Sequence, residues 1–132
     1  MPNQEPSPSR ARTLALQKRS FELTCGIICS YPTQKPLDDP SRDLWRQLIR
    51  AASSSTFNLE EADAASSDAD FVAKMRISLR EAKEAHVAIR MIVRCKLAAY
   101  QRVASFQDEA NQLASIFSTI VKNKSAHMQE GS

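Results

Sequence analysis

Residues 70–92 read DFVAKMRISLREAKEAHVAIRMI and form the clearest helical pattern of the chain. Its apolar and small residues recur in alternating steps of four and three: Phe71, Met75, Ser78, Ala82, Ala85, Ile89 and Ile92. Such spacing places them on one side of an α-helix, as the seam of a helix packed lengthwise against others. We therefore predict a helix that begins at Asp68 or Asp70 and presents one straight apolar face to its neighbours.

Three further segments have the pattern of amphipathic helices. We expect the first over residues 13–30, the second over about 41–65 after a cap at Ser41 or Asp43, and the last from Phe106. Their apolar positions recur at helical spacing: Leu14, Phe21, Cys25 and Ile28, with Leu23 and Ile27 beside them; Leu44, Trp45, Leu48, Ala51, Ala52, Ser55 and Leu59; and Phe106, Ala110, Leu113, Phe117 and Ile120. Four such helices with short links predict an all-α, up-down-up-down four-helix bundle.

The placement of glycine and proline supports this class. All six prolines lie in the first 40 positions, and no glycine stands between Gly26 and Gly131. Phosphate-cradling loops and the tight turns of β-sandwiches depend on glycine, so a glycine-rich nucleotide-binding loop is excluded. An all-β fold and a doubly wound α/β fold are disfavoured for the same reason.

Small residues in the first two helices predict close contacts. Gly26 weakens the first helix by about 1 kcal/mol relative to alanine, or it admits another helix at short range. The middle of the second helix, residues 51–56, reads AASSST. Small side chains let a neighbour approach and hydroxyls can bond back to the preceding turn, so a tight contact or a kink is expected near Ser54.

Length and composition describe one domain with two tails. We expect a disordered N-terminal tail over residues 1–12, the four-helix bundle over 13–124 and a frayed C-terminal tail over 125–132. Aromatic residues make up only 6% of the chain, so the core is built mainly from aliphatic side chains. Thin helices of this kind leave much apolar surface, which favours a homo-oligomer.

The cysteines and the hydropathy indicate a cytoplasmic protein. Cys25, Cys29 and Cys95 match no metal-binding spacing and no disulfide framework. We expect Cys25 and Cys29, one helical turn apart, to be reduced thiols on or near an apolar face. No apolar run approaches the roughly 20 residues that a membrane span requires, and no signal-peptide core follows the N-terminus.

The third helix also carries a line of basic residues. Between Lys74 and Arg102 stand eight basic and two acidic residues, a local charge of +6. At 100° per residue, five of the eight fall within about 40° of one direction, roughly opposite the apolar seam. These five, called the basic stripe, are Arg76, Arg80, Lys83, Arg90 and Arg94. The stripe is about 27 Å long, and such arrays bind phosphate chains by releasing counterions, although a solvated helix face also carries charge.

Five acids between Leu59 and Phe71 form the opposite cluster: Glu60, Glu61, Asp63, Asp68 and Asp70. Paired carboxylates in a bundle can bind Mg²⁺ or a di-iron centre, but the Glu-x-x-His spacing of di-iron bundles is missing around His86. Acids at the start of the third helix also suit its dipole. His86 and His127 form no arrangement with a nucleophile, so we expect no catalytic residues, no metal and no cofactor.

Two motifs in residues 50–92 resemble a known family. The run from Arg50 to Glu61 fits R-A-A-x-S-x-x-x-N-x-x-E, and after Asp70-Phe71 the run from Ile77 is similar to I-A-L-x-E-A-x-E-T. Both resemble the four-helix-bundle family encoded in intervening sequences of bacterial 23S ribosomal RNA genes. The chain differs from the usual pattern at three positions: Ala62 for glycine, Ser78 for alanine and Ala85 for threonine.

The resemblance implies a left-handed four-helix bundle that assembles into a ring-shaped homopentamer without enzymatic activity. The related accessory proteins of diversity-generating retroelements are similar in fold and are thought to bind nucleic acid and a reverse transcriptase. Arg50, Asn58, Glu61 and Glu84 occupy the polar motif positions. A hydrogen-bond network that fixes helix register or subunit contacts is favoured for these residues over a ligand site.

Three functional hypotheses follow from these patterns. The leading one is a non-enzymatic oligomeric bundle that binds RNA or DNA through the basic stripe. The second is a scaffold or accessory subunit whose basic face binds an acidic protein such as a reverse transcriptase. The third is a metal- or nucleotide-dependent enzyme that uses Glu60, Glu61 and Glu84.

Overall fold

The computed structural model describes residues 4–33 and 36–131, and within them every regular element is helical. Four long helices and one short helix follow each other along the chain: α1 (Pro8–Cys29), α2 (Asp39–Asp63), α3 (Asp68–Arg94), α4 (Tyr100–Ala104) and α5 (Gln107–Glu130). The prediction of an all-α fold is therefore confirmed.

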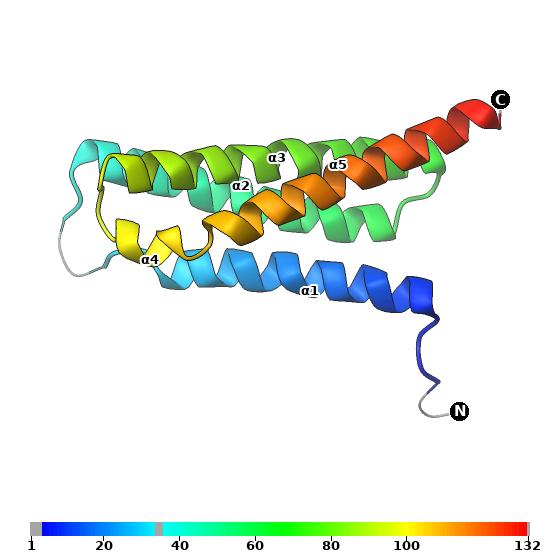
Figure 1. Cartoon of the computed structure of the whole chain (residues 1–132), viewed down its shortest axis with the longest axis horizontal. Helices are drawn as coiled ribbons and strands as arrows, with labels where there is room; N and C mark the ends of the chain where they lie inside the picture. The colour runs from blue at the N-terminus through cyan, green and yellow to red at the C-terminus, as the bar shows by residue number, and fades with distance from the viewer. Residues whose placement is uncertain (1–3, 34–35, 132) are drawn as a thin grey trace.

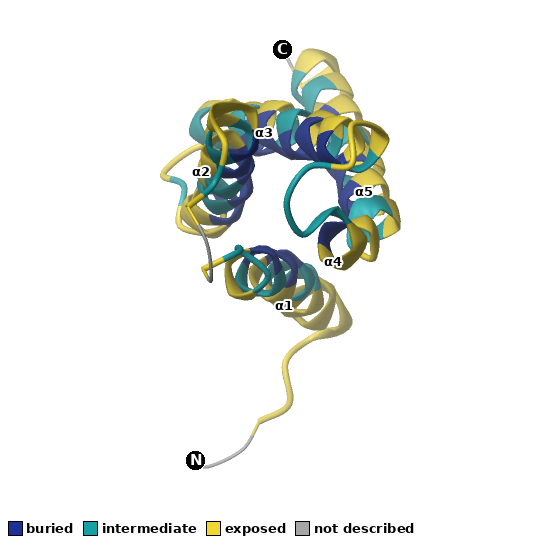
Figure 2. Cartoon of the chain, turned by 90° about the vertical axis from the view of Figure 1, so that its left-hand side faces the viewer, coloured by how far each residue is buried: buried dark blue, intermediate teal, exposed yellow. Residues whose placement is uncertain are grey.

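The four long helices surround one core. Figure 1 shows consecutive long helices running in alternate directions, and α5 leaning away from α1 toward its C-terminal end. In Figure 2 the buried faces point inward, toward the space that the four helices share. The α3 helix packs against both α2 and α5, whereas α1 packs mainly on α2. The left-handed sense of the bundle stays a prediction.

Both ends of the chain are more helical than the pattern predicts. The first helix begins at Pro8 rather than near Thr13, because the Ser7 hydroxyl accepts a hydrogen bond from the Arg10 amide and proline suits the first turn. The last helix continues to Glu130 instead of fraying from residue 125. The predicted tails therefore shorten, and their outermost parts, residues 1–3 and 132, lie outside the described residues.

The other helix ends differ from prediction by a few residues. The N-cap of α2 is Asp38, whose carboxylate accepts the Ser41 amide at 2.8 Å, rather than Ser41 or Asp43. This bond holds the pKa of Asp38 below its usual value. The link between α3 and α5 contains the short helix α4. The link contacts α2 just before α4 begins, where the Trp45 indole N–H donates to the Ala98 carbonyl at 2.8 Å.

The seam predicted for α3 lies in the core of the molecule. Met75, Ser78, Ala82, Ala85, Ile89 and Ile92 are all buried, and Phe71 packs at the edge of the same cluster. On the opposite side the residues are exposed, as the 100° geometry requires.

The apolar face predicted for the first helix is correct at Leu23 and Ile27, which are buried, but wrong for the line beside them. Leu14, Phe21 and Ile28 are exposed, with Phe21 at 53%, whereas Ile27 is fully buried. The inward face of α1 is instead formed by Ser20, Leu23, Thr24 and Ile27. This choice follows from polar contacts with α2, since Thr56 Oγ1 lies 2.8 Å from Ser20 Oγ and 2.9 Å from Thr24 Oγ1.

Small residues bring α2 and α3 together, as the AASSST segment predicts. Ser55 Oγ donates to the Ser78 carbonyl at 2.9 Å, and Ser78 Oγ donates to the Ser55 carbonyl at 2.8 Å. Both serines are buried, so each hydroxyl satisfies its hydrogen-bonding need across the helix pair rather than along its own helix. The contact is centred on Ser55, one residue after the predicted position.

Gly26 admits an aromatic ring rather than a helix backbone. A Cβ at this position would lie 2.7 Å from two carbon atoms of the Phe106 ring, which is closer than van der Waals contact. Phe106 immediately precedes α5, so the glycine lets the chain turn into α5 against the surface of α1.

Candidate nucleic-acid interface

The basic stripe lies on one exposed face of α3. Residues 76, 80, 83, 90 and 94 are all exposed, and each belongs to the same uninterrupted helix, so the rigid backbone fixes their spacing. The prediction that these residues share a solvent-facing side is thereby confirmed in position. Their binding role is a separate question.

The cations of the stripe have weak internal partners. Arg76 reaches the Ser125 hydroxyl at 3.4 Å, and Arg80 Nε lies 3.9 Å from the Glu81 carboxylate. The ion pairs within the described residues leave Lys83, Arg90 and Arg94 without a carboxylate partner. Elsewhere the pairing is closer, as in the 2.6 Å contact between Arg19 and Glu109. The stripe therefore keeps most of its charge available to an anion.

A shallow apolar groove interrupts the stripe, which the sequence pattern does not predict. It has a volume of about 400 Å³ and lies between the start of α2 and the C-terminal half of α3. Its lining consists of Leu44, Gln47, Arg80, Lys83, Glu84, Val87, Ala88 and Met91. Val87 and Met91 are 40% and 48% exposed. Their helical angle places them with the stripe, but only the packing of α2 adds Leu44.

Two of the family-motif residues meet between α2 and α3. Arg50 donates to Glu84 Oε2 at 2.8 Å and to Glu81 Oε2 at 3.2 Å. The hydrogen bond that Arg50 donates to Glu84, together with the charge of Glu81, raises the pKa of Arg50 above its usual value. Glu81 is only 6% exposed, and it was not among the predicted site residues. Glu81 occupies the first Glu of the I-A-L-x-E-A-x-E-T pattern, and that motif position is the signal that could have found it.

The other two motif residues do not join this network. Asn58 donates to the Ser54 carbonyl of its own helix at 2.9 Å, and Glu61 pairs with Lys74 at 3.2 Å. Asn58 and Glu61 therefore have partners other than Arg50 in this structure. Arg50, Glu61 and Glu84 thus form ion pairs between α2 and α3, and Asn58 bonds within α2.

The acidic cluster between α2 and α3 is divided among separate contacts. Three of its carboxylates pair with cations of other helices: Glu61 with Lys74, Asp63 with Arg10 and Asp68 with Lys124. The Arg10 guanidinium holds the pKa of Asp63 below its usual value. Within residues 4–33 and 36–131, no three His, Cys, Asp or Glu side chains gather as metal ligands would. The hypothesis of a metal centre built from Glu60, Glu61 and Glu84 therefore has no geometric support.

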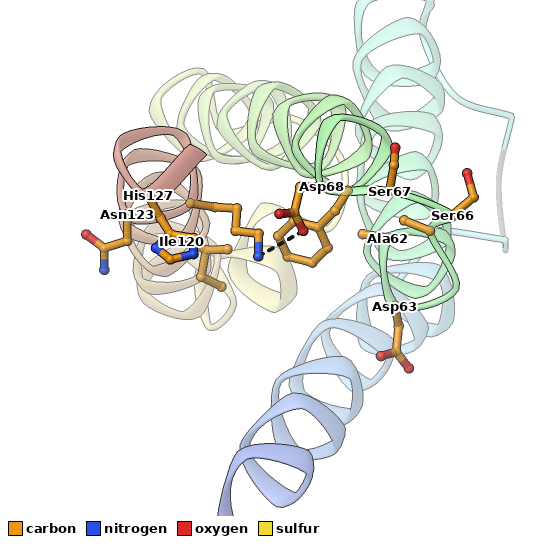
Figure 3. A pocket seen from close by; sticks show the side chains of 11 residues that line it. Ala62, Asp63, Ser66, Ser67, Asp68, Ile120, Asn123 and His127 are labelled. Carbon is orange, nitrogen blue, oxygen red and sulfur yellow. Dashed lines mark ion pairs between the residues drawn. The ribbon is translucent and has the colours of Figure 1, made fainter. Parts of the chain in front are cut away.

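A cavity of about 690 Å³ lies between the link from α2 to α3 and the C-terminal half of α5. Figure 3 shows Asp68 in its middle, where a dashed line marks the ion pair with Lys124, and Asn123 and Ser66 pointing away. Lys124 also lies over the Phe71 ring, 6.0 Å from its centroid. Since Asp68 neutralises Lys124 at 3.0 Å, this cavity offers little charge to an anion.

His86 lies on α3, Cys25 and Cys29 lie on α1, and Cys95 caps the C-terminus of α3. Burial lowers the pKa of His86, and the nearby charge of Arg90 lowers it further, so the ring stays neutral at physiological pH. Cys25 is partly buried, and Cys29 and Cys95 are exposed; all three are free thiols. In the part of the chain that the structure describes, no helix combines the length and apolarity of a transmembrane segment.

Comparison with known proteins finds one solved structure with a similar fold and one matching family. The chain resembles a crystal structure from Bacteroides thetaiotaomicron, described as a protein with unknown function from the S23 ribosomal protein family. The TM-score is 0.69 at 24% sequence identity, and the match covers 81% of this chain and 98% of the other. Among curated proteins, none matches this chain. Residues 12–119 match the family described as 23S rRNA-intervening sequence protein, and the chain belongs to that family.

Proposed function

We propose that this chain is a non-enzymatic helical bundle that binds the phosphate backbone of RNA or DNA through the basic stripe of α3. The observation that carries the proposal is the exposure of five aligned cations, of which Lys83, Arg90 and Arg94 have no carboxylate partner among the described residues. A cation that is already paired gains little from a phosphate, whereas an unpaired cation releases a counterion when it binds one.

The number of phosphate contacts sets the expected salt dependence. If all five stripe residues contact phosphates, the logarithm of the affinity falls with the logarithm of the salt concentration with a slope of about −4.5 for duplex DNA. For single strands the corresponding slope is about −3.5. Because phosphate contacts carry no sequence information, we expect little sequence preference from the stripe alone.

The test is a titration of the purified protein into labelled RNA and DNA at several salt concentrations. The variant Arg90→Glu/Arg94→Glu should lose most of the affinity and flatten the salt slope. Its matched control is Lys18→Glu/Arg46→Glu, which makes the same change in net charge at exposed residues of α1 and α2. An equal loss of affinity in both variants would mean that net charge, rather than the stripe, attracts nucleic acid.

An acidic protein, such as a reverse transcriptase, is the second candidate partner of the same face. The exposed Val87 and Met91 support it, since apolar groups beside cations also suit an acidic protein surface. Capture experiments with and without nuclease separate the two candidates, because a direct protein contact survives removal of nucleic acid. Loss of all partners after nuclease treatment would leave nucleic acid as the ligand.

We further propose that the chain self-associates through α1, toward the homopentamer that the resemblance implies. Leu14, Phe21 and Ile28 follow each other at intervals of seven residues, and all three are exposed large apolar side chains. A seven-residue apolar repeat suits lengthwise packing against another helix. In a single copy of the chain this apolar line is exposed to water, which supports an interface with a second copy.

Sedimentation tests this association. Phe21→Lys should lower the oligomeric state, whereas Phe57→Lys, which charges an isolated exposed residue of α2, should leave it unchanged. A monomeric wild-type protein at micromolar concentration would contradict the proposal, and so would an oligomer that Phe21→Lys leaves intact.

A further inference from the structure

The apolar groove lies within the basic stripe. Along α3, Val87 stands four residues after Lys83 and three before Arg90, so exposed apolar surface separates two groups of stripe cations. Lys83 and Arg90 are about 10 Å apart along the helix axis, from the 1.5 Å rise per residue. A strand that follows the stripe must therefore cross the groove.

The charges around the groove favour an anionic occupant. Arg80 and Lys83 form its rim, and both are exposed. The one acidic residue in the lining, Glu84, accepts a hydrogen bond from Arg50 at 2.8 Å, so its charge is balanced from α2. Phosphates can thus approach the rim without meeting an uncompensated carboxylate.

The apolar lining of the groove favours a single strand over a duplex. In a duplex the bases are stacked inside, so the apolar surface of Val87 and Met91 would stay in contact with water. In a single strand an unstacked base can turn outward and cover this surface. The Met91 thioether suits an aromatic ring, and Gln47 places an amide group in the same lining.

A helix of a protein partner fits this groove less well. The exposed apolar surface of α3 extends from Val87 to Met91, one helical turn of about 6 Å. Helices that dock in grooves use anchors at positions i, i+4 and i+7, which span about 10 Å. One base matches the available length better than an amphipathic helix does.

We infer that the ligand of the basic stripe is a single-stranded nucleic acid, with one unpaired base seated in the groove formed by Leu44, Val87 and Met91. This inference rests on the proposed nucleic-acid function and names the form of its ligand. The stripe cations hold the phosphates on either side, and the groove supplies the contact that a duplex cannot use.

Three labelled probes of equal phosphate number test the inference: a single strand, a duplex and an abasic single strand. At matched salt the wild-type protein should bind the single strand about five- to tenfold more tightly than the abasic strand, as one base–side-chain contact contributes. The variant Val87→Ser/Met91→Ser should lose this advantage while keeping its affinity for the abasic strand and the duplex. Its salt slope should stay unchanged because no charge is altered.

The control variant Phe57→Ser removes one exposed apolar side chain from α2, outside the groove, and should behave as wild type. All replaced residues are exposed, so the variants are expected to fold, and circular dichroism spectra check this. Equal binding of the single strand and the abasic strand would overturn the inference. A groove variant that weakens all three probes equally would overturn it too, because the groove contact would then be independent of bases.

The outcomes for the stripe and for the groove remain distinguishable. If no probe binds at low salt, the proposed function fails and the inference fails with it. If all probes bind and the groove variant Val87→Ser/Met91→Ser binds each of them as the wild-type protein does, the proposed function stands and the inference fails. The groove variant can also keep wild-type affinity for all probes and yet lose a protein partner that survives nuclease treatment. In that case the groove binds that protein, and the inference is overturned.

Discussion

Lys96 ends α3 in a backbone conformation that usually requires glycine. Its φ is 52°, in the left-handed region. The Lys96 amide donates to the Val93 carbonyl at 3.2 Å, and the Leu97 amide donates to the Ile92 carbonyl at 3.0 Å. These two bonds form a Schellman motif, in which glycine is preferred because a Cβ is disfavoured at positive φ. We therefore expect Lys96→Gly to be more stable to unfolding than a variant that keeps the Cβ.

The magnitude follows from opposing contributions. Removal of the Cβ relieves about 1–2 kcal/mol of left-handed strain. The greater freedom of glycine in the unfolded chain costs about 0.5–1 kcal/mol. Lys96 also places a positive charge near the C-terminus of α3, worth about 0.3–1 kcal/mol, which any neutral replacement loses. Lys96→Ala loses the same charge but keeps the Cβ. The free energy of unfolding of Lys96→Gly should therefore exceed that of Lys96→Ala by about 0.5–1 kcal/mol.

Urea unfolding followed by far-ultraviolet circular dichroism measures this difference. The Lys96→Gly midpoint should be higher than that of Lys96→Ala at an unchanged m-value, with all proteins at one concentration. Lys96 is exposed, so neither variant disturbs the core. Ala99→Gly provides a second case, since the φ of Ala99 is 58°. Equal midpoints for Lys96→Gly and Lys96→Ala would refute the reasoning.

Three further predictions concern the packing of the bundle. Gly26→Ala should lower the free energy of unfolding by about 1 kcal/mol, because a crowded Phe106 ring outweighs the better helix propensity of alanine. In a Phe106→Ala background the sign should reverse, and urea midpoints that shift alike in both backgrounds would contradict this. Glu109→Gln should cost about 0.5–1 kcal/mol at pH 7, since its partner Arg19 is partly exposed. Arg19 holds the pKa of Glu109 below its usual value, so the contribution is complete above the unfolded pKa of about 4.3 and is lost as pH falls through the folded value. Thermal melts should show the gap from wild type closing in acid, and a constant gap down to about pH 2 would count against the pair. Ser78→Ala should cost about 1 kcal/mol, the value of one hydrogen bond, whereas Ser78→Leu should cost about 3 kcal/mol by overpacking α2 against α3. A leucine tolerated there in urea unfolding would show that the two helices do not pack closely.

Some features of the candidate site follow from local sequence and others do not. The stripe could be predicted because its five residues stand on one helix, and 100° per residue fixes their common direction. The Arg50–Glu84 contact was indicated only as a shared motif, and Glu81 was not singled out although the same motif contains it, because an acid at a seam edge can equally face water. The groove was missed because it needs Leu44 from α2 beside Val87 and Met91.

Periodicity alone predicts the helical class and the two sides of α3, since a 3.6-residue repeat without glycine or proline gives one helix with opposite faces. The inward face of α1, in contrast, depends on contacts between helices. Both Phe21 and Ile27 are apolar, so periodicity gives no preference between their faces. The Ser20 and Thr24 hydroxyls settle the choice by bonding to Thr56 of α2, because buried polar groups must find partners that lie far away in sequence.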